Sequence, residues 1–140
     1  ISTPTCDNWK GQTMKRRTEK DLTKSCLRIL EIFLAQKKIA HCDRLNSGEI
    51  LSKKGKIIYK VILCKNGTPD LYFITNDGHT YWIENKVAGT AAAAYKKLRP
   101  EQKDFIAKIE NVPHHHVWII WDAQDLLEKL NSLLDNKSSK

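Results

Sequence analysis

Residues 67–86, GTPDLYFITNDGHTYWIENK, constrain the fold of this chain more than any other segment. Two apolar runs flank an Asn-Asp-Gly turn, a pattern that predicts a β-hairpin. Pro69 cannot donate a ladder hydrogen bond, so we expect the first strand to begin directly after it, at Asp70. Glu84 closes the second strand, and Lys86 shares its face because residues two apart in a strand point the same way. Two carboxylates and an amine are therefore expected at one end of the hairpin.

The length of the turn decides whether the two carboxylates can meet. A two-residue loop, the default for Asp77-Gly78, would place Asp70 opposite Asn85 and turn Glu84 to the other face. A three-residue loop of residues 76–78 would place Asp70 opposite Glu84, with Gly78 in the left-handed conformation of a bulge. We predict the three-residue loop or, failing that, a compensating bulge near Asp70.

The remaining pattern predicts an α/β fold in which helices flank a mixed sheet. Apolar residues at helical spacing predict a helix over about 19–36, with Thr18 and Asp21 forming a capping box. Residues 40–50 predict a short strand that leads into a glycine turn, and residues 55–63 predict a β-branched strand. The continuous apolar run 116–121 predicts a strand covered on both faces. Pro100 suits the first turn of another helix, and Asp122 can cap a last one. The expected order is helix, three or four strands, helix, strand, helix, or α-β-β-β-α-β-α in its shortest form.

The domain organisation expected from the sequence is simple. Residues 18–135 form one domain, which follows a basic and poorly ordered or peripheral segment 1–17 and precedes a polar tail, 136–140. An alanine run at 91–94 is compatible with a helical turn, although Gly89 weakens that prediction. No role follows from the sequence for residues 88–97.

Composition narrows the classes of partner and compartment. The net charge of +8 and the isoelectric point of about 9.4 favour a polyanionic partner, most simply nucleic acid. No apolar run approaches the roughly 20 residues of a membrane span, and no signal peptide is evident, so we expect no membrane association. Four cysteines without a Cys-x-x-Cys pair favour a reduced, intracellular protein, in a bacterial or viral cytoplasmic setting.

The hairpin residues suggest a definite chemistry. Two carboxylates that lie close together repel each other, and a divalent cation relieves this repulsion. An adjacent lysine can hold the attacking water, help to deprotonate it and offset charge on a phosphate. Asp70, Glu84 and Lys86 therefore predict a site for metal-assisted phosphodiester hydrolysis, and the alternative is a hairpin with scattered surface charge.

The same residues resemble a known family. The stretches GTPDLYF, IENK and KLRPEQ, preceded by TEKDLTKSCLRIL and RLNSG, occur in the order found in the VRR-NUC branch of the PD-(D/E)XK nuclease superfamily. The resemblance covers about residues 18–130. It implies a restriction-endonuclease-like core and a Mg²⁺- or Mn²⁺-dependent DNA endonuclease that leaves a 5′-phosphate. Stand-alone proteins of this kind resemble structure-selective nucleases that act on branched DNA such as four-way junctions, as homodimers.

The resemblance also implies residue roles. The implied catalytic residues are Asp70, Glu84, Lys86 and Gln102. The implied metal ligands are Glu19, directly or through water, Asp70, Glu84 and the backbone carbonyl of Asn85. Two positions depart from the family pattern: Arg99 replaces a helix-capping serine, and Asn85 replaces an apolar residue whose carbonyl alone is required.

Several alternatives stay open. Gln102 is also compatible with a satisfied buried amide, and Glu19 with a plain acid at a helix N-terminus. Residues 114–116, three histidines, alternate sides in an extended chain, so at most two could share one ion, and we favour a strand entry that faces nucleic acid. The whole chain could instead be a nucleic-acid-binding module with a vestigial site, or a nuclease directed at RNA. Around a nuclease cleft, basic residues become phosphate contacts, and those predicted are Lys53, Lys54, Lys96, Lys97 and Arg99.

Overall fold

The structure is a computed structural model, and it describes residues 18–45, 48–64 and 67–138. The basic segment 1–17 that the sequence sets apart lies outside the described residues. The same is true of residues 139 and 140, at the end of the expected polar tail.

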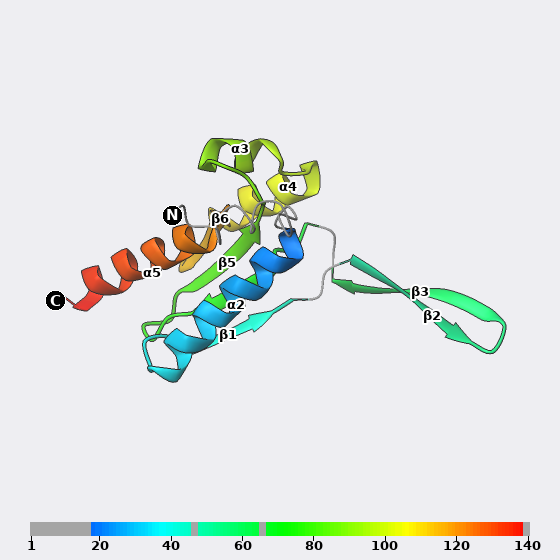
Figure 1. Cartoon of the computed structure of the whole chain (residues 1–140), viewed down its shortest axis with the longest axis horizontal. Coiled ribbons are helices and arrows are strands. Elements are labelled where there is room, and N and C mark those ends of the chain that lie inside the picture. The colour runs from blue at the N-terminus through cyan, green and yellow to red at the C-terminus, as the bar shows by residue number, and fades with distance from the viewer. Residues whose placement is uncertain (1–17, 46–47, 65–66, 139–140) are drawn as a thin grey trace, which may run out of the picture.

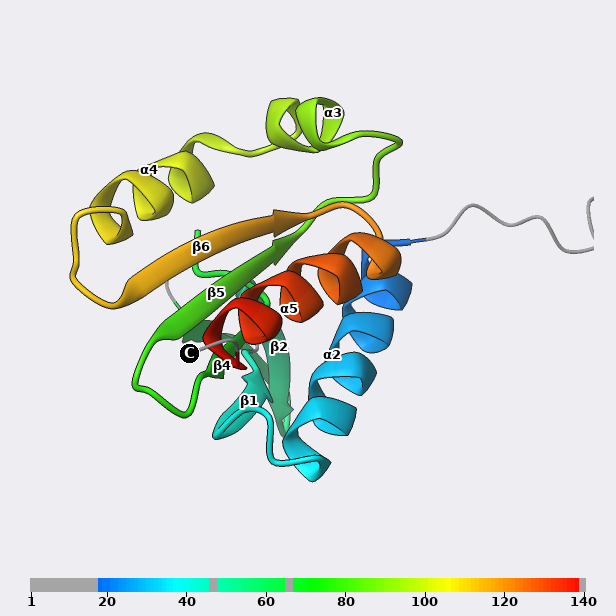
Figure 2. The same cartoon turned by 90° about the vertical axis from the view of Figure 1, so that its left-hand side faces the viewer.

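A four-stranded mixed sheet forms the centre of the molecule (Figure 1). Its strand order is β1-β4-β5-β6, with antiparallel pairs except for β5 and β6, which run parallel. Two helices cover one face and two shorter helices cover the other (Figure 2). The strands are β1 (His41–Arg44), β4 (Leu71–Ile74), β5 (Thr80–Asn85) and β6 (His115–Ile120). The helices are α2 (Glu19–Ala35) and α5 (Ala123–Ser138) on one face, and α3 (Ala91–Lys96) and α4 (Pro100–Ile109) on the other. The predicted α/β fold with a helix-flanked mixed sheet is confirmed at this level.

The expected order of elements is wrong in the number of strands, because five rather than three or four precede the next helix in the described part of the chain. The stretch 40–50, expected to be a short strand that leads into a glycine turn, contains β1 and the start of β2 (Gly48–Lys54), and β2 pairs with β3 (Ile57–Cys64) in a separate hairpin. An apolar, β-branched pattern predicts a strand but does not identify its partner, so it could not show that β3 lies outside the central sheet. The sequence left helix α3 open, because Gly89 weakens a helix prediction. The helix starts after Thr90, whose Oγ1 accepts a hydrogen bond from the Ala93 N–H at 3.1 Å and so caps it.

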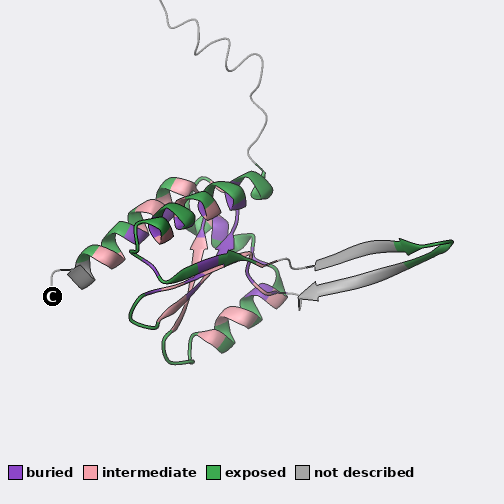
Figure 3. Ribbon diagram, turned by 90° about the horizontal axis from the view of Figure 1, so that it is seen from below, coloured by how far each residue is buried: buried purple, intermediate pink, exposed green. Residues whose placement is uncertain are grey.

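The core lies between the sheet and the pair α2 and α5 (Figure 3). Its fully buried side chains include Leu22, Cys26, Leu30, Leu71, Phe73, Ile83, Ile120, Leu126 and Leu130. The predicted capping box is present: Thr18 Oγ1 accepts from the Asp21 N–H at 3.1 Å, and the Asp21 carboxylate accepts from the Thr18 N–H at 3.3 Å. This cap fixes the first turn of α2, and with it the position of Glu19.

The turn between β4 and β5 is the predicted three-residue loop. Ile74 pairs with Thr80, and the Thr75 N–H donates to the His79 carbonyl at 2.8 Å, which leaves residues 76–78 in the loop. Gly78 has a φ of 91°, in the left-handed region. At the other end of the hairpin the regular pairing ends at Leu71 and Ile83. The Asp70 N–H donates to the Ile83 carbonyl at 3.1 Å, one residue out of that ladder, so Asp70 directly precedes the paired strand.

The second half of the chain largely follows the expected pattern. Helix α4 begins at Pro100, β6 occupies 115–120 and Asp122 Oδ1 accepts a hydrogen bond from the Gln124 N–H at 2.9 Å, as a helix cap does. Helix α5 runs to Ser138, into the stretch that the sequence assigned to a tail. Within the described residues, no helix combines the length and the apolarity that crossing a membrane requires.

Candidate active site

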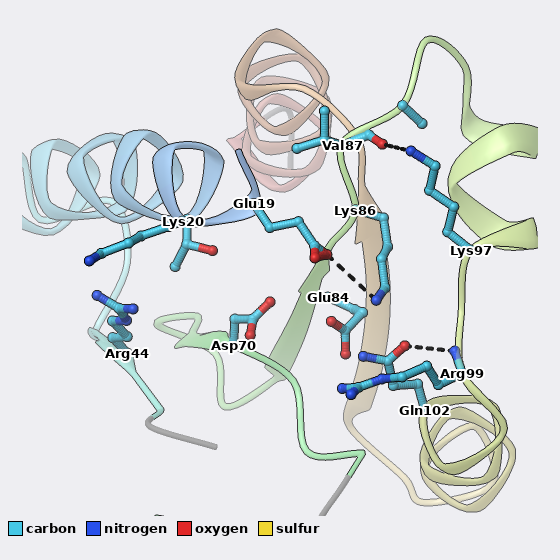
Figure 4. Close-up of a pocket in the computed structure, with 12 residues that line it drawn as sticks. Glu19, Lys20, Arg44, Asp70, Glu84, Lys86, Val87, Lys97, Arg99 and Gln102 are labelled. Atoms are coloured by element: carbon cyan, nitrogen blue, oxygen red, sulfur yellow. Dashed lines mark hydrogen bonds and ion pairs between the residues drawn. The ribbon is translucent and has the colours of Figure 1, made fainter. Parts of the chain in front are cut away.

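A cavity of about 890 Å³ lies where β5 ends, between the first turns of α2 and α4 (Figure 4). Most of its lining is polar or charged. The lining residues are Glu19, Lys20, Thr23, Arg44, Asp70, Glu84, Lys86, Val87, Ala88, Lys97, Arg99 and Gln102. The structure therefore brings together in one cavity the five side chains predicted from four separate stretches of the sequence, Glu19, Asp70, Glu84, Lys86 and Gln102.

Asp70 and Glu84 form a carboxylate pair in the floor of the cavity. Burial raises the pKa of Glu84 to about 8, and the negative charge of Asp70 contributes to that rise. Burial also raises the pKa of Asp70, against the opposing effect of the Asn85 N–H, which donates to its carboxylate at 3.4 Å. Ionising both groups is costly in this environment because each has lost water and faces a like charge. The pair is thus suited to a divalent cation.

Lys86 links this pair to helix α2. Its side chain is only 9% exposed, and its Nζ lies 3.5 Å from Oε1 of Glu19. The Lys86 N–H donates to the Ile120 carbonyl at 2.9 Å, so the strand geometry of β5 continues to this residue and keeps Lys86 on the face of Glu84. Figure 4 shows the ammonium group between Glu19 and Glu84.

Asn85 points its side chain away from the cavity. Its Nδ2 donates to Thr23 Oγ1 at 3.1 Å, and its Oδ1 accepts from Cys26 Sγ at 3.6 Å, so the amide ties β5 to α2. These bonds satisfy the polar groups of the Asn85 amide, as a buried amide requires. The N–H and C=O of one residue point to the same side of a strand, and the Asn85 N–H faces Asp70. Its carbonyl is therefore directed to the same side, as a ligand role requires.

Gln102 lies at the start of α4 and is buried. Its Oε1 accepts a hydrogen bond from the Arg99 N–H at 2.8 Å, which leaves the Nε2 donors for the cavity. Figure 4 shows this amide beside Glu84. The Arg99 side chain makes no cap bond of its own and lies at the cavity, with Nε 3.4 Å from Oε1 of Glu101. An arginine at the start of this helix thus places a cation at the site.

Gly67 packs the loop before Asp70 against α4. It has a φ of 93°, and a Cβ at this position would lie 2.3 Å from the Glu101 carbonyl oxygen. Only glycine fits this approach without movement of the helix or the loop. The contact couples the position of Asp70 to that of Gln102, the residue that follows Glu101. Gly67 belongs to the GTPDLYF stretch, but no packing role was predicted for it, because a glycine before Thr-Pro is typical of an ordinary turn.

The predicted basic residues are divided between three places. Lys97 and Arg99 line the cavity. Lys96 is exposed on α3 and is not part of the lining, and Lys53 and Lys54 are exposed on the β2–β3 hairpin.

Lys20 and Arg44 also line the cavity, although neither is among the individual residues predicted to contact phosphate. Figure 4 shows them beside Asp70, across the cavity from Lys97 and Arg99. Lysine on a helix and arginine on a strand usually lie on solvated faces, so the sequence carried no signal for them. The cavity thus has an acidic floor between two basic rims.

The histidines lie at the other end of the sheet. His115 pairs in register with Thr80, at the start of β5, whereas the carboxylates lie at its end. His115 Nδ1 accepts from Trp82 Nε1 at 3.2 Å, and His116 stacks on the Tyr81 ring with a centroid separation of 4.4 Å. Trp82 and Tyr81 are neighbours in a strand, so the two histidines occupy opposite faces, as the alternation argument predicted.

The oxygen atoms of the cavity define which metal could bind. Among the residues that the structure describes, no set of three or more His, Cys, Asp or Glu side chains has the arrangement of a preformed metal centre. The available donors are the Asp70 and Glu84 carboxylates and the Asn85 carbonyl. Mg²⁺ typically takes one or two carboxylates and keeps several waters, so this donor set fits Mg²⁺ or Mn²⁺ better than it fits zinc.

Comparisons of the chain with protein-family models, with curated proteins and with solved structures found no match.

Proposed function

We propose that this chain is a Mg²⁺- or Mn²⁺-dependent endonuclease that hydrolyses phosphodiester bonds in DNA, on a restriction-endonuclease-like core of the VRR-NUC type. One observation carries the proposal: Asp70 and Glu84 lie side by side with Lys86 in a cavity rimmed by cations. Scattered surface charge would not produce a buried carboxylate beside a half-buried one, both with raised pKa values. The resemblance of the motifs in their shared order points to the same chemistry.

The metal would be held by Asp70, Glu84 and the Asn85 carbonyl, with Glu19 reaching it directly or through water. When bound, it would polarise the scissile phosphate and acidify a water molecule. Glu19 is 54% exposed and ion-paired to Lys86, which favours the less direct role.

Lys86 positions the nucleophile in this proposal. Its ammonium group lies close to the carboxylates of Glu19 and Glu84, where it can donate hydrogen bonds to a water and to a phosphate oxygen. The water oxygen forms a bond to phosphorus and loses a proton to one of the carboxylates of the cavity. The bond from phosphorus to the 3′ oxygen breaks, and that oxygen takes a proton from solvent, which leaves a 3′-hydroxyl and a 5′-phosphate. Gln102 Nε2 supplies a further neutral donor near Glu84.

The two basic rims bind the strand that is cut. Lys20 and Arg44 lie on one side of the carboxylates, and Lys97 and Arg99 on the other. Lys97 Nζ donates to the Val87 carbonyl, which fixes the ammonium group near the end of β5. Phosphates on either side of the scissile bond could be held in this way, because phosphate contacts position a strand without reading its sequence. The net charge of +8 supports a polyanionic substrate.

Branched DNA and a homodimer with two such sites complete the proposal, and both rest on the resemblance. The test is a substrate panel: a four-way junction, a flap, a plain duplex, single-stranded DNA and single-stranded RNA, each with Mg²⁺, Mn²⁺ or EDTA. We expect metal-dependent cutting of the junction, with 5′-phosphate ends. Preferential cutting of RNA would change the substrate class, and the absence of cutting from every lane would leave a binding module.

A further inference from the structure

The β2–β3 hairpin stands apart from the rest of the molecule. Its strands pair only with each other, and within the described part of the chain neither contacts another helix or strand. Figure 1 shows it projecting from the body. A two-stranded ribbon that packs on no other element is marginally stable in water, so the contacts described within the chain do not explain why this hairpin is present.

The hairpin is rooted at the rim of the candidate active site. β1 ends at Arg44, shortly before the hairpin, and Asp70 follows it along the chain. Arg44 and Asp70 both line the cavity. Strands of seven and eight residues extend roughly 25 Å at about 3.3 Å per residue. That length spans about seven base pairs of a duplex at about 3.4 Å each.

The tip of the hairpin carries one lysine and one isoleucine on each face. Lys53 lies opposite Ile58, and Lys54 opposite Ile57, across a tight turn that begins at Gly55 with a φ of 63°. Residues directly opposite in an antiparallel pair point to the same face. Ile57 and Ile58 are 68% and 66% exposed, which is unusual for large apolar side chains, and Figure 3 shows the exposed tip.

The charge of the tip indicates the chemical class of its partner. Lys56 adds a third exposed cation in the turn, and residues 50–63 contain no acid. Contact between the tips of two copies would bring the same lysines together without a counter-charge, because a two-fold interface uses the same patch on both subunits. Exposed lysines and exposed isoleucines together fit a polyanion that has apolar surface between its charges. A nucleic-acid duplex is such a partner, because its stacked bases lie between its phosphates.

We propose that the β2–β3 hairpin is an arm that grips double-stranded nucleic acid beside the cavity, with Lys53, Lys54 and Lys56 on phosphates and Ile57 and Ile58 inserted against the bases. In proteins that bind the minor groove, apolar wedges of this kind partly unstack a base step and bend the duplex. The inference rests on the proposed function for its substrate class. It adds a second contact, outside the cavity, that distorts the duplex.

The test measures distortion without cleavage. The full chain, in EDTA, is mixed with duplexes that carry 2-aminopurine at successive positions, and its fluorescence reports unstacking. We expect a rise at one position with the wild type, loss of that rise with Ile57→Ser/Ile58→Ser, and no change with the control Ile32→Ser, an isoleucine of α2 that is 50% exposed.

A second variant tests the charges. Lys53→Gln/Lys54→Gln should reduce the slope of log affinity against log salt by about 2, since each phosphate contact contributes about 1. The matched control is Lys24→Gln/Lys108→Gln, which makes the same charge change on exposed positions of α2 and α4.

The outcomes separate the hairpin from the active site. Metal-dependent cutting with unchanged distortion and unchanged salt slope in the tip variants would overturn the hairpin proposal and leave the proposed function in place. Tip-dependent distortion without cutting by the wild type would support the hairpin and defeat the proposed function. Tip variants that convert a dimer to a monomer at unchanged duplex affinity would show a self-association surface instead, and would overturn the proposal.

Discussion

Replacing Glu84 by glutamine should stabilise the metal-free protein at high pH. The Glu84 carboxyl is buried, and its pKa is raised from the ordinary 4.5 to about 8 by burial and by Asp70. Between these values the folded state holds a proton that the unfolded state has released. The contribution of Glu84 to stability is therefore fully present below about pH 4.5 and is lost as the pH rises towards 8. Glutamine keeps the shape of the protonated acid and has no such dependence.

The size of the effect follows from the difference between the pKa of Glu84 in the folded state, about 8, and its ordinary value of 4.5. At about 1.36 kcal/mol per pH unit, it amounts to at most about 5 kcal/mol in the free energy of unfolding. We expect about 2–4 kcal/mol, since water entering the cavity relaxes around the ionised pair.

The assay is urea unfolding of the wild type and Glu84→Gln from pH 5 to 9 in EDTA, with the exposed Glu128→Gln as control. The wild type should lose stability relative to Glu84→Gln as the pH rises. Mg²⁺ should restore the stability of the wild type but not that of the variant, because a cation favours the ionised pair. Parallel curves for the two proteins, or equal stabilisation of both by Mg²⁺, would refute the reasoning.

Three further predictions concern the surroundings of the pair. Lys86→Ala should keep Mn²⁺ binding in calorimetry yet slow cleavage by about a hundredfold or more, as expected for loss of a group that positions the nucleophile; unchanged cleavage would remove Lys86 from the site. Gly67→Ala should cost about 2 kcal/mol in urea unfolding, because its Cβ would meet the Glu101 carbonyl, while Gly89→Ala, with nothing within 4 Å, should be nearly neutral. Equal midpoints for the two glycine variants would argue against the packing described. Arg44→Gln should weaken duplex binding and lower its salt slope by about 1, and an unchanged slope would show that this rim makes no phosphate contact.

Local chemistry in the sequence was enough to predict much of the site. Spacing and the position of Pro69 located Asp70, Glu84 and Lys86 at one end of a hairpin. The turn length was less direct: the Asp-Gly dipeptide alone favours two residues, and only the requirement that Asp70 face Glu84 selected the three-residue loop that the structure has.

The rest of the site depends on tertiary placement. Lys20 and Arg44 are ordinary charged residues until α2 and β1 bring them to the cavity. Likewise, the apolar pattern of β3 is the same for a strand buried in a sheet as for one in a projecting ribbon, because periodicity reports which residues alternate and not what covers them.

Cleavage of end-labelled four-way junction DNA by Asp70→Asn tests the central claim most directly. Asparagine preserves the size of the side chain and its place opposite Glu84 but removes the negative charge that a metal needs. We predict that the wild type cuts in Mg²⁺ and that Asp70→Asn does not, while the variant keeps its fold and binds the junction at least as tightly. Cutting by Asp70→Asn at the rate of the wild type would contradict the assignment of this carboxylate pair as the catalytic centre.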